Sequence, residues 1–172
     1  MQTPLDTDNA LALSRKWTLR AHGRQVVVVK KRRERASHVL IKAFIWALYL
    51  PEYPDLKIEV GIGGRYTPDV VQLDQRGQPV FWGEAGKVSP DKWASLLRRF
   101  PDTHFALARW AERLDPHVRI LRNALDGHAR RAPIDVISLP PDAPDRFVTD
   151  NGTVRVSLSD LDHVRLGGSG NA

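Results

Sequence analysis

The chain has 172 residues, of which 42% are apolar and 27% charged, a composition typical of one globular domain and not of a disordered segment. It contains no cysteine, which excludes disulfides, thiolate nucleophiles, Cys-ligated zinc and iron–sulfur clusters and fits a reducing cytoplasm. Neither an apolar run of about 18 residues nor the apolar core of a signal peptide is present, so we expect no membrane span.

The formal net charge is +6, and it is unevenly distributed. Residues 15–35 carry nine basic side chains and one acidic, and residues 87–131 carry ten basic and five acidic. Residues 50–84 between them carry six acidic and three basic side chains. An acidic centre between two basic flanks suits a polyanion held beside a cation site. The alternative is an arginine-rich surface that is simply solvated.

The chain is expected to consist of a flexible N-terminus (residues 1–14), one domain (15–165) and a flexible, glycine-rich tail (166–172). The domain opens with two predicted strands, residues 17–21 and 25–30, joined by a short hairpin turn. The second strand contains four consecutive valines, which strongly favour β-structure.

Helical spacing of apolar residues then predicts a largely buried helix over residues 33–50, which Pro51 ends. On its polar side Glu34, His38 and Lys42 recur every four residues, so they share one face. Basic residues at the start of a helix oppose its dipole, and a bound polyanion would relieve that conflict.

The remaining elements alternate between strands and helices, with predicted strands at 57–62, 67–73, 79–85, 103–108 and 134–139 and an edge strand at 153–158. A helix over residues 89–100 has a good N-cap in Ser89, followed by Pro90 and Asp91. A further helix is expected over 114–125, and residues 140–144 are expected to form a loop. Residues 61–65, although glycine-rich, lack the ending of a phosphate-binding loop and are interpreted as a turn.

The most informative residues are Asp69 and Glu84, on two strands of a hairpin whose turn centres near Arg76. The hairpin register places Asp69 opposite Gly83 or Glu84, and cross-strand neighbours have Cβ atoms only about 5 Å apart. Two carboxylates that close repel unless a cation or a proton lies between them. Mg²⁺ or Mn²⁺ suits such a site, and a solvent-exposed salt bridge with Arg65 or Lys87 is the alternative.

Pro68-Asp69, Glu84 and Lys87, in a helix–strand–strand–strand–helix–strand order, resemble the PD-(D/E)xK phosphodiesterase superfamily. More narrowly, the chain resembles the YaeQ-like branch, on segments 38–46, 66–69, 81–86 and 92–99. The resemblance implies an α/β fold with a mixed central sheet flanked by helices, and nuclease activity on nucleic acid. It also implies that Asp69 and Glu84 hold a divalent metal and that a lysine assists. A helix-borne acid often adds to such a site, and Glu34 or the face with His38 is the nearest match here.

The sequence departs from the superfamily motif at the lysine. The motif places Lys two residues after Glu, so that both side chains leave one face of the strand, but here that position is Gly86. Either Lys87 is turned back by a bulge at Gly86, or Lys92 reaches the site from the first turn of the next helix. Glu59 is either a third ligand or a solvent-facing carboxylate.

These residues predict a cytoplasmic, metal-dependent nuclease with Asp69, Glu84, Lys87 and Lys92 as candidate catalytic residues. The nucleic-acid contacts are expected from Lys31, Arg32, Arg33, His38, Lys42, Arg98 and Arg99. One alternative is a catalytically silent module on the same fold that binds nucleic acid or another protein. Another is a factor that acts on the transcription machinery without nucleic acid.

Overall fold

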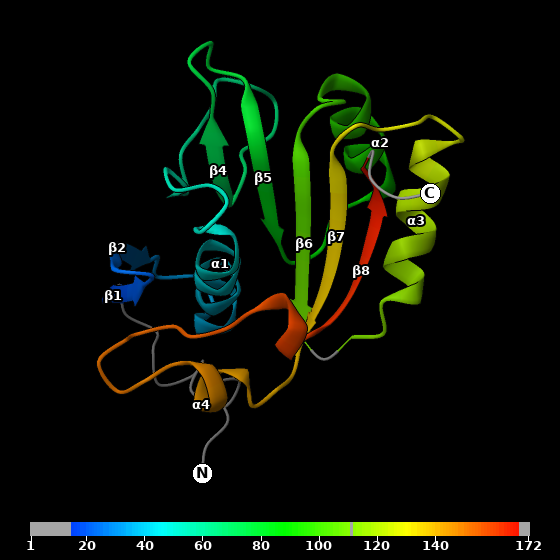
Figure 1. The fold of residues 1–172 in the computed structure, drawn as a ribbon. Helices are drawn as coiled ribbons and strands as arrows, with labels where there is room; N and C mark the ends of the chain where they lie inside the picture. Colours follow the sequence, from blue (N-terminus) through cyan, green and yellow to red (C-terminus); the bar gives the residue numbers. More distant parts are fainter. Residues whose placement is uncertain (1–14, 111, 169–172) are drawn as a thin grey trace.

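The computed structural model describes residues 15–110 and 112–168, which form a mixed α/β fold (Figure 1). Its centre is a six-stranded mixed sheet with the order β3-β4-β5-β6-β7-β8, and a separate two-stranded sheet precedes it. Residues 1–14, expected to be flexible, lie outside the described residues. Among the described residues, none of the helices combines the length and apolar character that crossing a bilayer would need.

The first part of the chain forms the small sheet and the central helix. The predicted hairpin is present as β1 (Arg15–Ala21) and β2 (Arg24–Lys30), which pair along their whole length. The predicted helix is α1 (Ala36–Tyr49), a few residues shorter at its start than the sequence pattern suggested. Its first turn contains no acidic residue, so the cations ahead of it are not balanced there.

The large sheet is built from an antiparallel half and a parallel half. β3 (Lys57–Ile58), β4 (Val70–Leu73) and β5 (Pro79–Ala85) are antiparallel neighbours. β6 (His104–Trp110) and β7 (Pro133–Leu139) run parallel to β5, and β8 (Asp162–Gly167) is antiparallel to β7. The crossovers contain α2 (Pro90–Arg99) and α3 (Asp115–Leu125), both as expected from the sequence.

The helices cover opposite faces of the sheet, with α1 on one side and α2 and α3 on the other (Figure 1). β5 supplies side chains to both cores: Phe81 and Ala85 pack in the α1 core, and Trp82 packs in the α2–α3 core. Glu84, two residues after Trp82, therefore projects toward α2 rather than α1. This alternation fixes which helix can supply a partner to the Glu84 carboxylate.

Several predicted boundaries were wrong at the ends of the sheet. The expected strand at 57–62 stops after Ile58, because Glu59 has a left-handed backbone with φ 58°. The expected strand at 153–158 is replaced by two isolated bridges and a 3-10 helix, η2 (Leu158–Asp160). Part of the expected loop at 140–144 belongs to α4 (Ala143–Phe147), and part of the expected flexible tail belongs to β8.

A buried carboxylate on β7 contacts β8, a strand that was not predicted. Asp135 on β7 has no exposed surface and accepts hydrogen bonds from Tyr49 Oη at 2.6 Å and Arg165 Nε at 2.7 Å. His104 Nε2 lies 2.8 Å from the same carboxylate. Together these contacts lower the pKa of Asp135, against the effect of its burial, which raises it. Arg165 thus links the last strand to the core through a long-range ion pair.

Gly83 is required by the close approach of α1 to β5. A Cβ atom at this position would lie 2.7 Å from Ile45 Cγ2 and 3.1 Å from Val70 Cβ. We expect Gly83→Ala to lower the free energy of unfolding by about 1–3 kcal/mol, because neither neighbour can move freely. Gly61, which has open space around it, is the control, and Gly61→Ala should change stability by less than about 0.5 kcal/mol. Urea unfolding of both variants checks this, and equal effects would contradict it.

Candidate active site

The centre of the candidate site is Glu84, which is only 4% exposed near the end of β5. Its Oε1 atom accepts a hydrogen bond from Trp82 Nε1 at 2.7 Å and lies 2.8 Å from Lys92 Nζ. Burial raises the pKa of the Glu84 carboxyl. The hydrogen bonds from Lys92 and Trp82 lower it, and the charge of Asp69 raises it further. Glu84 is thus a carboxylate that needs a nearby cation to stay ionised.

Lys92 supplies that cation from the first turn of α2. Ser89 caps this helix by accepting a hydrogen bond from the Lys92 backbone N–H at 3.2 Å, and Pro90 opens the helix. The chain turns from β5 into this cap through Gly86, whose φ of 101° is in a region that favours glycine. The lysine that reaches Glu84 is therefore Lys92. Lys87 is exposed, and it forms no ion pair with Asp69 or Glu84.

Asp69 lies immediately before β4 and extends the contacts between β4 and β5. Its backbone N–H donates to Gly83 O at 3.1 Å, and its Oδ2 atom accepts from the Ala85 N–H at 2.8 Å. The β4–β5 register pairs Val70 with Gly83, so Asp69 follows at the level of Glu84. The two carboxylates approach from different sides, with Glu84 held by α2 and Asp69 facing α1.

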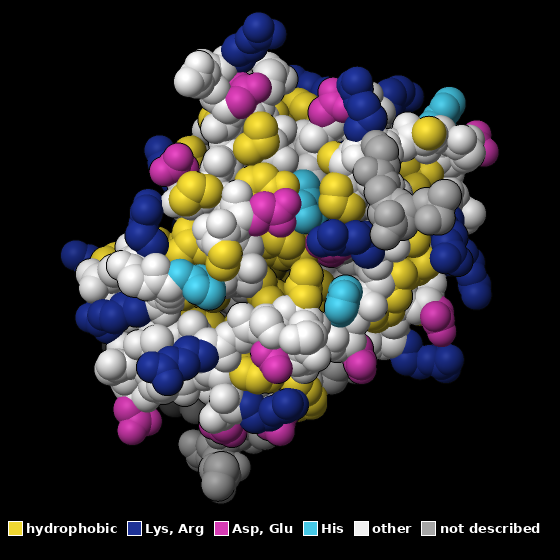
Figure 2. Space-filling view, viewed as in Figure 1, with side chains coloured by type: hydrophobic (Ala, Val, Ile, Leu, Met, Phe, Trp, Pro, Cys, Tyr) yellow, Lys and Arg dark blue, Asp and Glu magenta, His cyan; other side chains and the backbone are white. Residues whose placement is uncertain are grey.

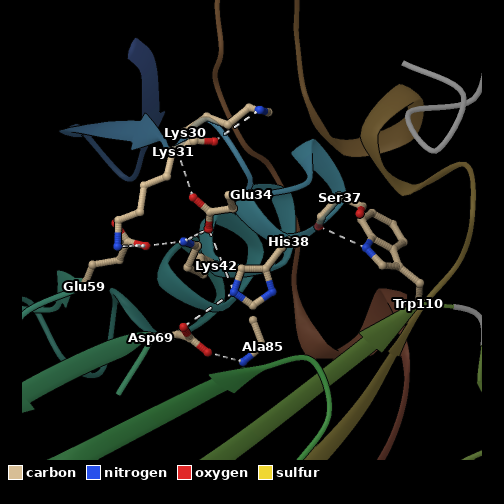
Figure 3. A network of polar contacts seen from close by, with 10 residues as sticks. All are labelled: Lys30, Lys31, Glu34, Ser37, His38, Lys42, Glu59, Asp69, Ala85 and Trp110. Carbon is tan, nitrogen blue, oxygen red and sulfur yellow. Dashed lines mark hydrogen bonds and ion pairs between the residues drawn. The ribbon is translucent and has the colours of Figure 1, made fainter. Parts of the chain in front are cut away.

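A second group of charges on the α1 side is connected to Asp69 through His38 (Figure 3). The His38 Nε2 atom lies 3.6 Å from Asp69 Oδ1 and 3.9 Å from Glu34 Oε1. The ammonium of Lys42 hydrogen-bonds Glu34 and also Glu59, the latter at 2.5 Å. The predicted shared face of Glu34, His38 and Lys42 is therefore present.

Lys42 does not suit the nucleic-acid contact that the sequence predicted for it. Its side chain has no exposed surface, and its charge is already balanced by Glu34 and Glu59. Glu59 is likewise not a free, solvent-facing carboxylate, because Lys31 lies 3.8 Å from it on its outer side. Spacing on the helix indicated the Glu34–Lys42 pair, but no local pattern indicated Glu59. It joins the group through a left-handed turn after β3.

The other predicted nucleic-acid contacts lie at two separate places. Lys31, Arg32 and Arg33 are exposed in the segment before α1, beside the half-buried His38. Arg98 and Arg99 are exposed in the last turn of α2. Figure 2 shows that, on the face drawn, Lys and Arg side chains lie mainly around the edge of the molecule and form no single continuous patch.

Asp69 and Glu84 can each offer one carboxylate oxygen to a cation, from different sides of the β4–β5 pair. Within residues 15–110 and 112–168, no group of three or more His, Cys, Asp or Glu side chains has the arrangement of a metal site. Glu84 uses only Oε1 for its hydrogen bonds, and Asp69 Oδ1 has only the long contact to His38. One oxygen of each carboxylate is therefore available. Mg²⁺ needs no more than one or two carboxylates, since it retains several waters.

Comparison with known proteins identifies the fold. No family model and no curated protein matches the chain. The YaeQ protein from Pseudomonas syringae is similar in structure, with a TM-score of 0.57, 14% identity, and coverage of 80% of this chain and 76% of that one. The YaeQ protein from Xanthomonas axonopodis pv. citri gives a TM-score of 0.54 and 14% identity over 77% of this chain and 76% of that one. The chain thus has a YaeQ-like fold.

The buried Lys42 should make a large contribution to stability. Lys42→Met would leave Glu34 and Glu59 without the ammonium that both contact, so we expect the free energy of unfolding to fall by about 3 kcal/mol. The exposed Lys87→Met serves as control and should change it by less than about 0.5 kcal/mol. Urea unfolding at neutral pH measures both, and a Lys42→Met protein as stable as the control would contradict the arrangement.

The raised pKa of Glu84 predicts a characteristic dependence of stability on pH. A carboxyl whose pKa is higher in the folded state binds its proton more tightly there. Its protonation therefore stabilises the folded protein, and this stabilisation is complete below the pKa of the unfolded state. That contribution is lost as pH rises through the folded pKa. Relative to wild type, Glu84→Gln should therefore gain stability as pH rises above about 4, by about 1.4 kcal/mol for each unit of pKa displacement.

Urea unfolding of wild type and Glu84→Gln at several pH values measures this slope. Asp150→Asn, which removes an exposed carboxyl far from the site in sequence, is the control and should show no such gain. A loss of stability of Glu84→Gln relative to wild type as pH rises would contradict the assignment of Glu84 to a buried, desolvated environment.

Proposed function

We propose that the protein is a cytoplasmic, metal-dependent phosphodiesterase of the PD-(D/E)xK type that hydrolyses nucleic acid. Asp69 and Glu84 would hold Mg²⁺ or Mn²⁺, and Lys92 would be the assisting lysine. The observation that carries the proposal is the 2.8 Å contact between Lys92 Nζ and Glu84 Oε1. This contact supports a site in which the positive charge comes from Lys92 on α2, because Lys87 just after the strand does not reach the carboxylates.

The residues around the pair fit a cation. Burial and the charge of Asp69 both raise the pKa of the Glu84 carboxyl, so a dication held by these residues would relieve an existing repulsion. What such an ion supplies when bound is polarisation of the phosphodiester and a lower pKa for an attacking water. The chain's own contribution is positioning: Ala85 N–H orients Asp69, and Trp82 and Lys92 orient Glu84.

Lys92 has a second role once a phosphate is bound. Its ammonium is only partly buried, with 21% of its side chain exposed, so it can contact both Glu84 and an incoming anion. A positive charge beside a reacting phosphate stabilises the charge that develops during hydrolysis. The segment before α1 supports substrate binding, because Arg32 and Arg33 are exposed there beside Lys31, and no acid in the first turn of α1 balances them.

A catalytically silent module that binds nucleic acid or protein is the second candidate. It is favoured by the fact that Trp82 and Lys92 already satisfy one oxygen of Glu84 without any metal. The exposed cations before α1 would still attract a polyanion in such a protein. The two candidates therefore differ in cleavage and not in binding.

The direct test is cleavage of plasmid DNA and of a structured RNA with Mg²⁺, Mn²⁺ or EDTA. Wild type should cleave at least one substrate with a divalent ion and neither in EDTA. Glu84→Gln should abolish cleavage, and Lys92→Met should reduce the rate by roughly 100-fold, as loss of a charge-stabilising group does elsewhere. Lys87→Met is the matched control and should retain the wild-type rate, because Lys87 is exposed and contacts neither carboxylate.

The outcomes separate the candidates. Absence of cleavage in wild type, together with binding that weakens steeply as salt rises, would favour the silent module. Cleavage that survives Glu84→Gln would contradict the assigned site. Equal losses in Lys87→Met and Lys92→Met would contradict the choice of lysine. Circular dichroism confirms that each variant is folded before its rate is interpreted.

A further inference from the structure

A pocket of about 380 Å³ lies on the α2 side of the sheet, and its lining includes Trp82, the hydrogen-bond donor to Glu84. It is formed by residues 62–66, by the turn between β4 and β5, and by α2. The residues that matter for its chemistry are Gly64, Arg65, Tyr66, Trp82, Arg99 and Phe100. Its volume lies within the range of about 300–1,000 Å³ that is usual for small-molecule sites.

The pocket is cationic. Two of its lining residues are arginines, and none is acidic. Within the part of the chain that the structure describes, neither Arg65 nor Arg99 forms an ion pair. Each guanidinium lies over an aromatic ring instead, Arg65 at 5.3 Å from the centroid of Tyr66 and Arg99 at 5.2 Å from that of Phe100. Stacked, unpaired guanidinium groups are well suited to bind phosphate.

The pocket also has aromatic walls. Tyr66 is half-buried, and the Nζ atom of Lys92 lies 5.4 Å from its ring centroid. Trp82 forms the inner wall and packs against Phe100 at 5.6 Å between centroids. Arg65 and Lys92 both lie near the Tyr66 ring, but the ring is only half-buried, and the part that lines the pocket provides a surface on which a nucleobase can stack.

Gly64 lies against the Arg99 guanidinium. A Cβ at this position would be in ordinary van der Waals contact with Arg99 Nη1, at 3.5 Å, so the loop and the end of α2 meet here. The chain bends at residues 63–65, within the glycine-rich segment for which the sequence predicted a turn. The same segment forms one wall of the pocket. Nothing in its sequence indicated that Arg99, more than thirty residues later, would lie against it.

The pocket is joined to the candidate active site through shared residues. Trp82 lines the pocket and donates its Nε1–H to Glu84. Lys92 contacts Glu84 and also lies over Tyr66. A ligand that contacts Trp82 in the pocket would thus be separated from the Glu84 carboxylate by that one side chain.

We propose that this pocket binds one unpaired nucleotide, with its base against Tyr66 and its phosphate between Arg65 and Arg99. This inference rests on the proposed function, because it assigns the substrate as a nucleic acid with a single-stranded or frayed end at the site. A base paired within a duplex is not free to enter a pocket between a loop and a helix, so cleavage should be faster on single-stranded than on duplex substrates.

The binding test uses isothermal titration calorimetry in the presence of EDTA. Adenosine monophosphate is the probe, and adenosine and inorganic phosphate are the partial ligands. EDTA removes any contribution from a metal. Adenosine monophosphate should bind more tightly than either partial ligand. Arg99→Ala should weaken binding by about tenfold or more, as expected for loss of a charged phosphate contact. Tyr66→Leu should weaken it by about tenfold through loss of stacking.

Arg98→Ala is the matched control, because Arg98 is also exposed, is the neighbouring residue on α2, and lines a different pocket toward α3. It should bind the probe like wild type. Equal weakening in Arg98→Ala and Arg99→Ala would overturn the pocket in favour of diffuse surface charge. Binding of inorganic phosphate as tight as that of the nucleotide would overturn the role of the base.

Binding and cleavage together separate this inference from the proposed function. If the nucleotide binds as described but wild type cleaves nothing, the pocket stands and the nuclease proposal fails. If wild type cleaves in a Glu84-dependent way but binds no nucleotide, the nuclease proposal stands and the pocket fails. Cleavage of duplex and single-stranded DNA at equal rates would also overturn the pocket's assigned role.

Discussion

The ion pair between Glu84 and Lys92 is the contact on which the candidate site depends. A carboxylate with 4% exposure cannot remain charged without a close partner, since removing it from water is costly. The strand continues into Gly86 where the superfamily motif would have lysine, so the partner comes from the next element. That requirement explains the sharp turn at Gly86 and the well-capped start of α2. A helix that began one turn later could not place Lys92 over Glu84.

The sheet separates two groups of charges that meet near the β4–β5 pair. On the α2 side, Glu84 pairs with Lys92, and the arginine pocket adjoins them through Trp82. On the α1 side, Lys42 is internal and holds Glu34 and Glu59 together. Asp69 lies between the two groups, with Ala85 on one side and His38 on the other. We propose the first group as the site of chemistry, whereas the buried Lys42 balances two carboxylates.

Local patterns were sufficient for most of the fold and for part of the site. The valines of β2, the apolar stripe of α1 and the Ser89-Pro90 cap of α2 are signals within a few residues, and the corresponding elements were confirmed. The hairpin register was also readable, because the turn near Arg76 fixes which residues pair. The mixed α/β class follows from these elements.

What the sequence could not supply depends on contacts between distant residues. β8 was missed because its apolar pattern is short, with only Val164 and Leu166 alternating; pairing with β7 and the ion pair between Arg165 and Asp135 add what the pattern lacks. The burial of Lys42 was missed because its second partner, Glu59, arrives through a left-handed turn. The choice between Lys87 and Lys92 stayed open because it depends on the direction of the chain at one glycine.

The most direct test is to measure Mn²⁺ binding by electron paramagnetic resonance. The proteins compared are wild type, Asp69→Asn, Glu84→Gln and the control Asp150→Asn. The account predicts that wild type and Asp150→Asn bind the ion with equal affinity and that Asp69→Asn and Glu84→Gln each bind it at least about tenfold more weakly, since each removes one of two carboxylate ligands. Equal Mn²⁺ affinity in all four proteins would contradict a metal site at Asp69 and Glu84.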